Sequence, residues 1–197
     1  MIKIGITGGI GSGKTTVCEI WQKQGAQVVY ADDLAKYLMQ DNKSVRQQIS
    51  ETFGEESYQP NGDLNRAYLA DKAFNKGRVE ELNSIVHPAV FKETDRLITQ
   101  AEKDGYDVFV YEAAILLHHG QPEKFDHIVM VLADERKRIT RVGKRDKANE
   151  NDVLERIRNQ QNFESLISMA DVVIRNNGSL RELEKEAIKV YKTLTRE

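Results

Sequence analysis

The sequence has a single cysteine and no long uninterrupted hydrophobic run among its 197 residues. One cysteine cannot form an intramolecular disulfide, and the neighbours of Cys18, which are Val17, Ile20 and Trp21, indicate the buried face of a helix. An apolar stretch of about 18 residues, as a membrane-spanning helix requires, is absent, and so is a secretion signal. We therefore expect a cytoplasmic protein with no membrane association.

An excess of charge of one sign is also missing, since 29 lysines and arginines face 31 aspartates and glutamates for a formal net charge of -2. This balance gives no sequence-independent attraction to nucleic acid, although local basic clusters could still bind a small anion. The sequence contains no internal repeat, low-complexity tract or flexible linker, so independent tethered domains are not expected. Nothing in it indicates an oligomeric state.

What the sequence does have is five apolar runs bounded by turn residues. These are IKIGIT (2–7), AQVVYA (26–31), YDVFVYEA (106–113), HIVMVLA (127–133) and DVVIRN (171–176). Most are too continuous for strands with one solvent-facing side, which favours buried parallel strands. Helical patterns separate them at 15–24, 88–103, from 135 onward and at 179–195. Alternating strands and helices predict an α/β fold with a parallel sheet covered by helices.

Two segments interrupt this alternation, a polar and mostly helical one at about 33–86 and a highly charged one at about 136–169. We therefore expect a single unit whose core comprises about 1–32, 87–135 and 170–197. The two other segments are excursions from the sheet.

The most specific pattern is GGIGSGKT, from Gly8 to Thr15, which fits G-x-x-x-x-G-K-[ST] between a strand and a helix. In such a loop the backbone N–H groups and the helix N-terminus hold phosphate groups. Lys14 can reach the β- and γ-phosphates of a nucleotide, and the Thr15 hydroxyl can ligate Mg²⁺. The pattern predicts a P-loop NTPase-type sheet with these ATP-binding residues: Gly11, Ser12, Gly13, Lys14, Thr15 and Thr16.

A phosphate loop does not by itself name the reaction. The guanine-specific N-K-x-D motif is absent, since NKGR at Asn75 has arginine where aspartate belongs, and the chain is short for a mechanical ATPase. A kinase needs a carboxylate near the γ-phosphate to accept a proton. Asp32 and Asp33 follow the second strand, where such a carboxylate is expected. A helix N-cap is the alternative for Asp32.

A kinase also needs basic side chains over the transferring phosphoryl group. Arg138, Arg141 and Arg145 recur at helical spacing in the charged excursion. A solvated charged helix explains most of these charges, but one or two arginines aimed at the phosphate would be sufficient.

Together these motifs resemble those of the dephospho-coenzyme A kinase family, nearly end to end. The matching segments are GITGGIGSGKTT, YADDLA, GDLNRAYLADKAF, IVHPAVF, RVGKRD and ADVVIRNNGSL. The resemblance implies transfer of the ATP γ-phosphate to the ribose 3′-hydroxyl of dephospho-coenzyme A with Mg²⁺, the last step of coenzyme A synthesis. It also implies that 33–86 is a helical substrate-binding region and 136–169 a lid.

Roles for individual residues follow from the same resemblance. Asp32 would be the catalytic base, acting with Lys14 and with Arg141 as a lid arginine. Arg66 and His87 would lie on the dephospho-coenzyme A side, together with Thr7 and Asp32. The residues near the adenine would be Asn176, Asn177 and Gly178. His87 precedes Pro88, so a plain helix-start residue is the alternative interpretation of that histidine.

The sequence departs from the family pattern at YEAAILLHHG, where many members have P-L-L, an aromatic residue and glutamate. His118 stands at the glutamate position, so no role for a glutamate is carried over there. His118 and His119 are adjacent and diverge in regular structure, which makes them a poor metal pair. Glu112 could orient a metal-bound water or be structural.

Two other functions remain open from the sequence. One is a different small-molecule P-loop kinase, such as a nucleoside monophosphate kinase. The other is a binding protein that uses ATP as a switch.

Overall fold

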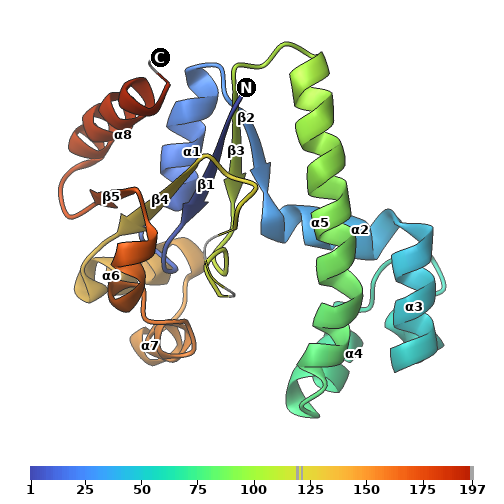
Figure 1. Ribbon diagram of the computed structural model, residues 1–197. Helices are drawn as coiled ribbons and strands as arrows, with labels where there is room; N and C mark the ends of the chain where they lie inside the picture. Colours follow the sequence, from blue (N-terminus) through green and yellow to red (C-terminus); the bar gives the residue numbers. More distant parts are fainter. Residues whose placement is uncertain (119, 121, 196–197) are drawn as a thin grey trace. The chain divides into compact units, whose positions relative to one another are not determined.

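The computed structural model describes residues 1–118, 120 and 122–195 (Figure 1). The chain divides into two compact units. The sheet unit comprises Met1–Val29 and Ala101–Glu197, and the helical unit comprises Tyr30–Gln100. Each unit is described by itself.

The sheet unit is built around a parallel sheet in which the described residues form five strands. These are β1 (Ile2–Thr7), β2 (Gln27–Tyr30), β3 (Val108–Glu112), β4 (His127–Leu132) and β5 (Val172–Arg175), in the order β2-β3-β1-β4-β5. Every residue of β3 is buried, as its continuous apolar pattern predicts. The five predicted strands and the parallel α/β sheet are thus confirmed.

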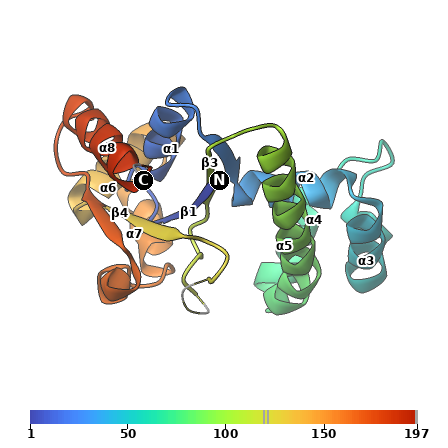
Figure 2. The same ribbon diagram turned by 45° about the horizontal axis from the view of Figure 1, so that its top comes forward.

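Helices α1 (Lys14–Lys23) and α8 (Leu180–Leu194) lie side by side in both views (Figures 1 and 2) and pack through the indole of Trp21. The Trp21 Nε1–H donates to the Ala187 carbonyl at 2.8 Å, and its ring lies 6.0 Å from that of Tyr191. Cys18 is fully buried on the same helix, which confirms its expected place in the core. The charged segment of this unit folds as α6 (Glu135–Asp146), α7 (Glu150–Arg158) and a 3₁₀ helix at Glu164–Met169.

The helical unit contains α2 (Ala31–Asp41), α3 (Lys43–Phe53), α4 (Arg66–Ala70) and most of α5 (Val79–Lys103). A 3₁₀ turn at Glu55–Ser57 and a π-helix at Asp71–Asn75 complete it. The expected start of a helix at Pro88 is wrong, because α5 begins nine residues earlier and contains that proline. Buried Leu82, Val86 and Val90 recur at every fourth position. Their packing stabilises the helix and offsets the backbone hydrogen bond that is lost because proline has no N–H.

Within the part of the chain that is described, no helix combines the length and the apolar character needed to cross a bilayer.

Candidate active site

The loop between β1 and α1 ends in a backbone conformation that favours glycine. Gly13 is the N-cap of α1 with a φ of 104°, in the left-handed region. A Cβ atom at this position would lie 2.4 Å from the Asn176 side-chain nitrogen, so any other residue would also collide with the neighbouring segment. The first turn of α1 contains no acidic residue. The positive end of the helix is therefore open to an anion.

All the carbonyl groups from Gly8 to Gly13 accept hydrogen bonds. The donors are Lys14 Nζ to Gly8 (2.8 Å) and Gly9 (3.4 Å), Arg138 Nε to Ile10 (2.9 Å), Arg141 Nη1 to Gly11 (3.4 Å), Asn176 Nδ2 to Ser12 (2.8 Å) and the Val17 N–H to Gly13 (3.1 Å). Among the described residues, the N–H groups of Gly11 and Gly13 have no such partner. The loop thus has satisfied acceptors and open donors, which is the polarity that a phosphate group requires.

The side chain of Lys14 lies at this loop in a nearly buried ion pair. Its Nζ is 3.5 Å from Oε1 of Glu112 at the end of β3, and the two side chains are 10% and 11% exposed. Glu112, whose role the sequence left open, therefore supplies the counter-charge of Lys14. Thr15, in contrast, is exposed in the first turn of α1, where its hydroxyl can meet a ligand.

Thr7 ends β1 beside the segment that follows β3. Its Oγ1–H donates to the Ala114 carbonyl at 3.3 Å, and the Gln161 side chain donates to the same oxygen at 3.2 Å. These bonds hold the end of β1 and the start of that segment together.

Arg141 of α6 connects the phosphate loop to the segment after β5. Its Nη2 donates to the Asn176 carbonyl at 3.0 Å and to the Asn176 Oδ1 at 3.2 Å. Asn177 exchanges two hydrogen bonds with Asp134, at 2.7 and 2.8 Å, and its carbonyl accepts from Lys137 Nζ. The structure thus brings the predicted lid arginine and Asn176 to the phosphate loop, whereas Asn177 is held at the start of α6.

The charged-helix interpretation holds for only part of α6. Arg145 is exposed and pairs with Asp146 at 2.7 Å, which lowers the pKa of that carboxyl group. Arg138 and Arg141, in contrast, are partly buried against the loop. One face of the helix is solvated, and the other holds the loop backbone.

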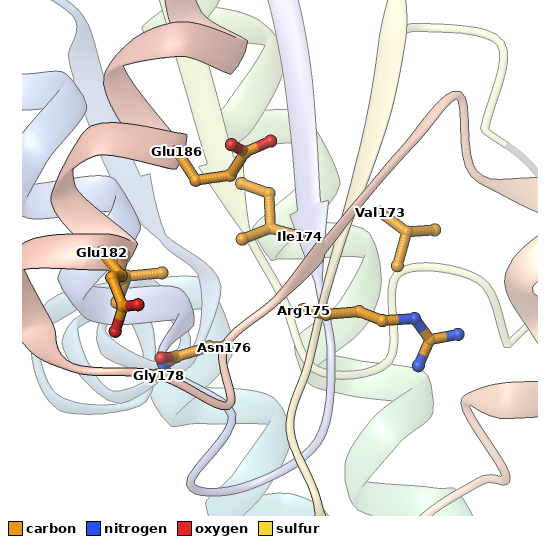
Figure 3. Close-up of a pocket in the computed structure, with 8 residues that line it drawn as sticks. Val173, Ile174, Arg175, Asn176, Gly178, Glu182 and Glu186 are labelled. Carbon is orange, nitrogen blue, oxygen red and sulfur yellow. The ribbon is translucent and has the colours of Figure 1, made fainter.

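A pocket of about 470 Å³ lies between β5 and the start of α8 (Figure 3). It is lined by Val173, Ile174, Arg175, Asn176, Gly178, Glu182, Leu183 and Glu186. In Figure 3 Glu182 and Glu186 extend from α8, whereas Val173 and Arg175 point to the other side of the strand. Of the predicted ATP-binding residues, Asn176 and Gly178 line this pocket, and Asn176 Nδ2 also donates to the Ser12 carbonyl of the phosphate loop at 2.8 Å.

Three predicted site residues belong to the helical unit. Asp32 is the second residue of α2 and is exposed, while Tyr30 is the N-cap, so the N-cap interpretation of Asp32 is wrong. Arg66 is exposed at the first position of α4. His87 is half-buried inside α5, 6.3 Å from the Phe91 ring, which also rules out the helix-start interpretation.

Sequence reasoning missed Gln160, whose Oε1 accepts from the Ile10 N–H at 2.8 Å and from Arg138 Nη2 at 3.2 Å. An amide in a highly charged segment was the only signal. His118 is exposed, and His119 lies outside the described residues. The described part of the chain holds no group of three or more histidine, cysteine, aspartate or glutamate side chains that could bind a metal.

Comparison with known proteins gives one consistent family. The dephospho-CoA kinase family model matches residues 2–182. A dephospho-CoA kinase of Salinibacter ruber is 43% identical over 99% of this chain and 98% of its own length, and one of Corynebacterium glutamicum is 37% identical over 96% of each.

Solved structures agree with this result. A crystal structure of a Thermus thermophilus protein has a TM-score of 0.81 at 30% identity and covers 99% of this chain and 98% of its own. A dephospho-CoA kinase from Campylobacter jejuni shares the fold, with a TM-score of 0.66 at 21% identity and coverage of 98% and 96%. The chain belongs to the dephospho-CoA kinase family, whose members use ATP to phosphorylate dephospho-CoA in the last step of coenzyme A biosynthesis.

Proposed function

We propose that this chain transfers the γ-phosphate of ATP to the ribose 3′-hydroxyl of dephospho-CoA, giving CoA and ADP. Besides the family relationship, the observation that carries the proposal is the polarity of the phosphate loop, whose carbonyls from Gly8 to Gly13 are all occupied by donors. A loop of this polarity attracts anions and repels cations.

On the nucleotide side, Lys14 and Arg141 carry the charge that stabilises the transferring phosphoryl group. The Lys14 Nζ lies 2.8 Å from the Gly8 carbonyl oxygen, so its ammonium group is held at the loop. The loop residues Gly11 to Thr16 bind the phosphates, and Asn176, Asn177 and Gly178 lie near the adenine.

The donor set fits Mg²⁺, which uses one or two protein oxygens and takes its remaining ligands from substrate phosphates and water. The exposed Thr15 hydroxyl would hold it. When bound, the ion neutralises charge that develops on the phosphates.

On the acceptor side, Asp32 accepts the proton of the 3′-hydroxyl. An exposed carboxylate with no hydrogen-bond or ion-pair partner among the described residues is free for this task. Arg66 and His87 bind dephospho-CoA, and Thr7 contributes from the end of β1. In this proposal 33–86 is the substrate-binding region and 136–169 the lid, and the cytoplasmic location stays a prediction.

The test is incubation with Mg-ATP and single hydroxyl acceptors, with the products identified by mass spectrometry. Dephospho-CoA should gain one phosphate per ATP consumed. CoA is the matched control, because its 3′-hydroxyl is already phosphorylated and it should gain none. Preferential phosphorylation of nucleoside monophosphates would support the other kinase, and ATP turnover without an acceptor would support the switch protein.

A further inference from the structure

One residue of the phosphate loop, Ile10, is held through both its N–H and its carbonyl group by two side chains that lie outside the motif segments quoted above. The N–H belongs to the Gly9–Ile10 peptide and the carbonyl to the Ile10–Gly11 peptide. The Ile10 N–H donates to Gln160 Oε1 at 2.8 Å, and the Ile10 carbonyl accepts from Arg138 Nε at 2.9 Å. Arg138 Nη2 donates to the same Gln160 oxygen at 3.2 Å. Ile10, Gln160 and Arg138 therefore form a closed ring of three hydrogen bonds, which we call the Ile10 clamp.

The clamp acts on the point of the loop where the backbone can flip. Gly9 to Ser12 form a turn in which the Ser12 N–H donates to the Gly9 carbonyl at 3.1 Å, and Gly11 has a φ of 75°. That φ at the third position is typical of a type II turn, and the type I alternative has its central peptide rotated. The central peptide here joins the Ile10 carbonyl to the Gly11 N–H.

The bond from Arg138 selects one of these two orientations. In a planar trans peptide the carbonyl and the N–H point in opposite directions. Because the guanidinium of Arg138 holds the Ile10 carbonyl, the Gly11 N–H must point away from Arg138. This N–H is one of the open donors of the loop.

The guanidinium of Arg138 lies tightly against the loop. A Cβ atom on Gly9 would come within 2.5 Å of its Nη2. Burial lowers the pKa of Arg138, which agrees with a charge withdrawn from water, while nearby Glu135 opposes that shift. A side chain held this closely has little freedom to release the Ile10 carbonyl.

The clamp also joins the two ends of the helix pair formed by α6 and α7. Arg138 is the fourth residue of α6, and Gln160 lies two residues beyond the end of α7. Both ends of this helix pair are therefore tied to a single residue of the phosphate loop, Ile10.

We propose that Arg138 and Gln160 are positioning residues of the phosphate loop, which orient the Ile10–Gly11 peptide so that the Gly11 N–H faces the nucleotide phosphates. The proposal rests on the proposed function only in taking a nucleoside triphosphate as the ligand. Without the clamp the peptide samples both orientations, and binding must first select the competent one.

The experiment uses Arg138→Met, Gln160→Met and the double variant, with Arg136→Met, an exposed arginine of α6, as the matched control. Affinity for a non-hydrolysable Mg-ATP analogue is measured without acceptor. Each single variant should bind about 3–10-fold more weakly, the cost of one or two lost hydrogen bonds. The double variant should be no weaker than the worse single variant, because Arg138 and Gln160 are bonded to each other and hold the same residue, Ile10.

Two further readouts separate positioning from general structural damage. Amide exchange of Ile10 in the nucleotide-free protein should accelerate in Gln160→Met and stay slow in Gln160→Glu, which keeps an acceptor oxygen. The KM for dephospho-CoA should change less than about twofold, whereas the KM for ATP rises with the analogue's dissociation constant. If Arg138→Met does not fold, Arg138→Lys keeps the charge and the stem and should weaken analogue binding alone.

Unchanged analogue affinity in folded variants, additive losses in the double variant, or equal losses for ATP and dephospho-CoA would each overturn the proposal. Analogue binding requires no acceptor. A wild-type protein that fails to phosphorylate dephospho-CoA would therefore refute the proposed function and leave this test intact.

Discussion

At the scale of single residues, Lys14 is more enclosed than a position at a helix start suggests. Its side chain is only 10% exposed, and it shares its charge between the loop carbonyls and Glu112. Removing one partner of a nearly buried ion pair leaves the other charge uncompensated. A substitution here therefore affects both chemistry and stability, and the two effects must be measured separately.

We predict that Lys14→Met, which keeps the aliphatic stem, lowers the rate of phosphoryl transfer by at least about 10²–10³-fold, the usual cost of removing one preorganised donor to a developing charge. Single-turnover transfer measures this loss, and thermal melting reports the separate effect on Glu112. Lys36→Met is the control, because Lys36 is an exposed lysine that pairs with the exposed Asp33. Near-normal transfer by a folded Lys14→Met protein would remove the central assignment.

Asp32 and Asp33 form a second, nearly matched pair. Both are exposed in the first turn of α2, so each loses the same type of favourable interaction with the helix dipole when it is neutralised. Asp33 pairs with Lys36 at 2.8 Å, whereas Asp32 has no partner among the described residues. Successive helical side chains point in different directions, so only one of the two can face the acceptor hydroxyl.

We predict that Asp32→Asn lowers turnover by about 10²–10⁴-fold, the usual contribution of a positioned general base, and leaves ATP affinity unchanged. Asp33→Asn should be much milder. Single-turnover transfer and ATP titration of both variants measure the difference. If Asp32→Asn transfers phosphate within a few-fold of the parent, the base must be sought elsewhere, and Glu112 is the next candidate.

At the scale of elements, the sequence predicted the five strands because continuous apolar runs leave no alternative to burial on both faces. It also placed the starts of α1 and α8 within a residue or two. It failed at Pro88, where a local rule for helix starts competed with packing of the apolar face of α5. The burial of apolar side chains determined where the helix begins, because tertiary packing commonly overrides local helix propensity.

In the candidate site, too, local motifs could be predicted and contacts set by tertiary packing could not. Residues whose positions are fixed by a contiguous motif, from Gly8 to Thr16, could be predicted, because strand, loop and helix follow one another directly. The Glu112 pairing and the Ile10 clamp could not, since Gln160 is 150 residues from its partner. Contacts at such separation are set by how the elements pack, and a single sequence contains no direct record of that.

Helix α1 provides a test of its packing through pH. Burial, more than the charge of Glu112, raises the pKa of the Cys18 thiol above its ordinary value. The unfolded chain loses this proton above about pH 8.5, whereas the folded protein keeps it. The thiol thus favours folding fully below that pH, and this contribution declines as the pH rises.

We predict that the free energy of unfolding falls between about pH 8.5 and 9.5 by up to about 1.4 kcal/mol per pH unit. Urea unfolding at several pH values measures this slope, below the range where tyrosines titrate. Cys18→Ala should lower the stability at every pH and lose the cysteine-dependent part of the slope. If the free energy of unfolding depends on pH equally in the two proteins, the Cys18 thiol is not buried away from water.

At the scale of the whole molecule, the proposed roles divide between the two compact units. The loop proposed to bind phosphate belongs to the sheet unit, as does Arg141, whereas Asp32, Arg66 and His87 belong to the helical unit. A kinase built this way can separate nucleotide binding from acceptor binding. Substitutions in the two units should then have different kinetic signatures.

We predict that Arg141→Ala acts mainly on turnover and Arg66→Ala mainly on dephospho-CoA binding. Arg141 donates to the Gly11 and Asn176 carbonyls, so its loss removes positive charge at the loop where we propose that the phosphoryl group is transferred. Arg66 is exposed on α4, where it can bind an anionic ligand. Each loss should be about 10–100-fold, the cost of a hydrogen bond to a charged group.

Steady-state kinetics with each substrate varied separates the two effects, with direct titration of dephospho-CoA because KM equals a dissociation constant only when chemistry is slow. Arg136→Ala on α6 and Arg96→Ala on α5 are the matched controls, since both arginines are exposed and lie outside the proposed site. They should leave both constants within about twofold. If Arg141→Ala and Arg66→Ala weaken dephospho-CoA binding equally, the acceptor is not held by the helical unit alone, and the division of roles between the units fails.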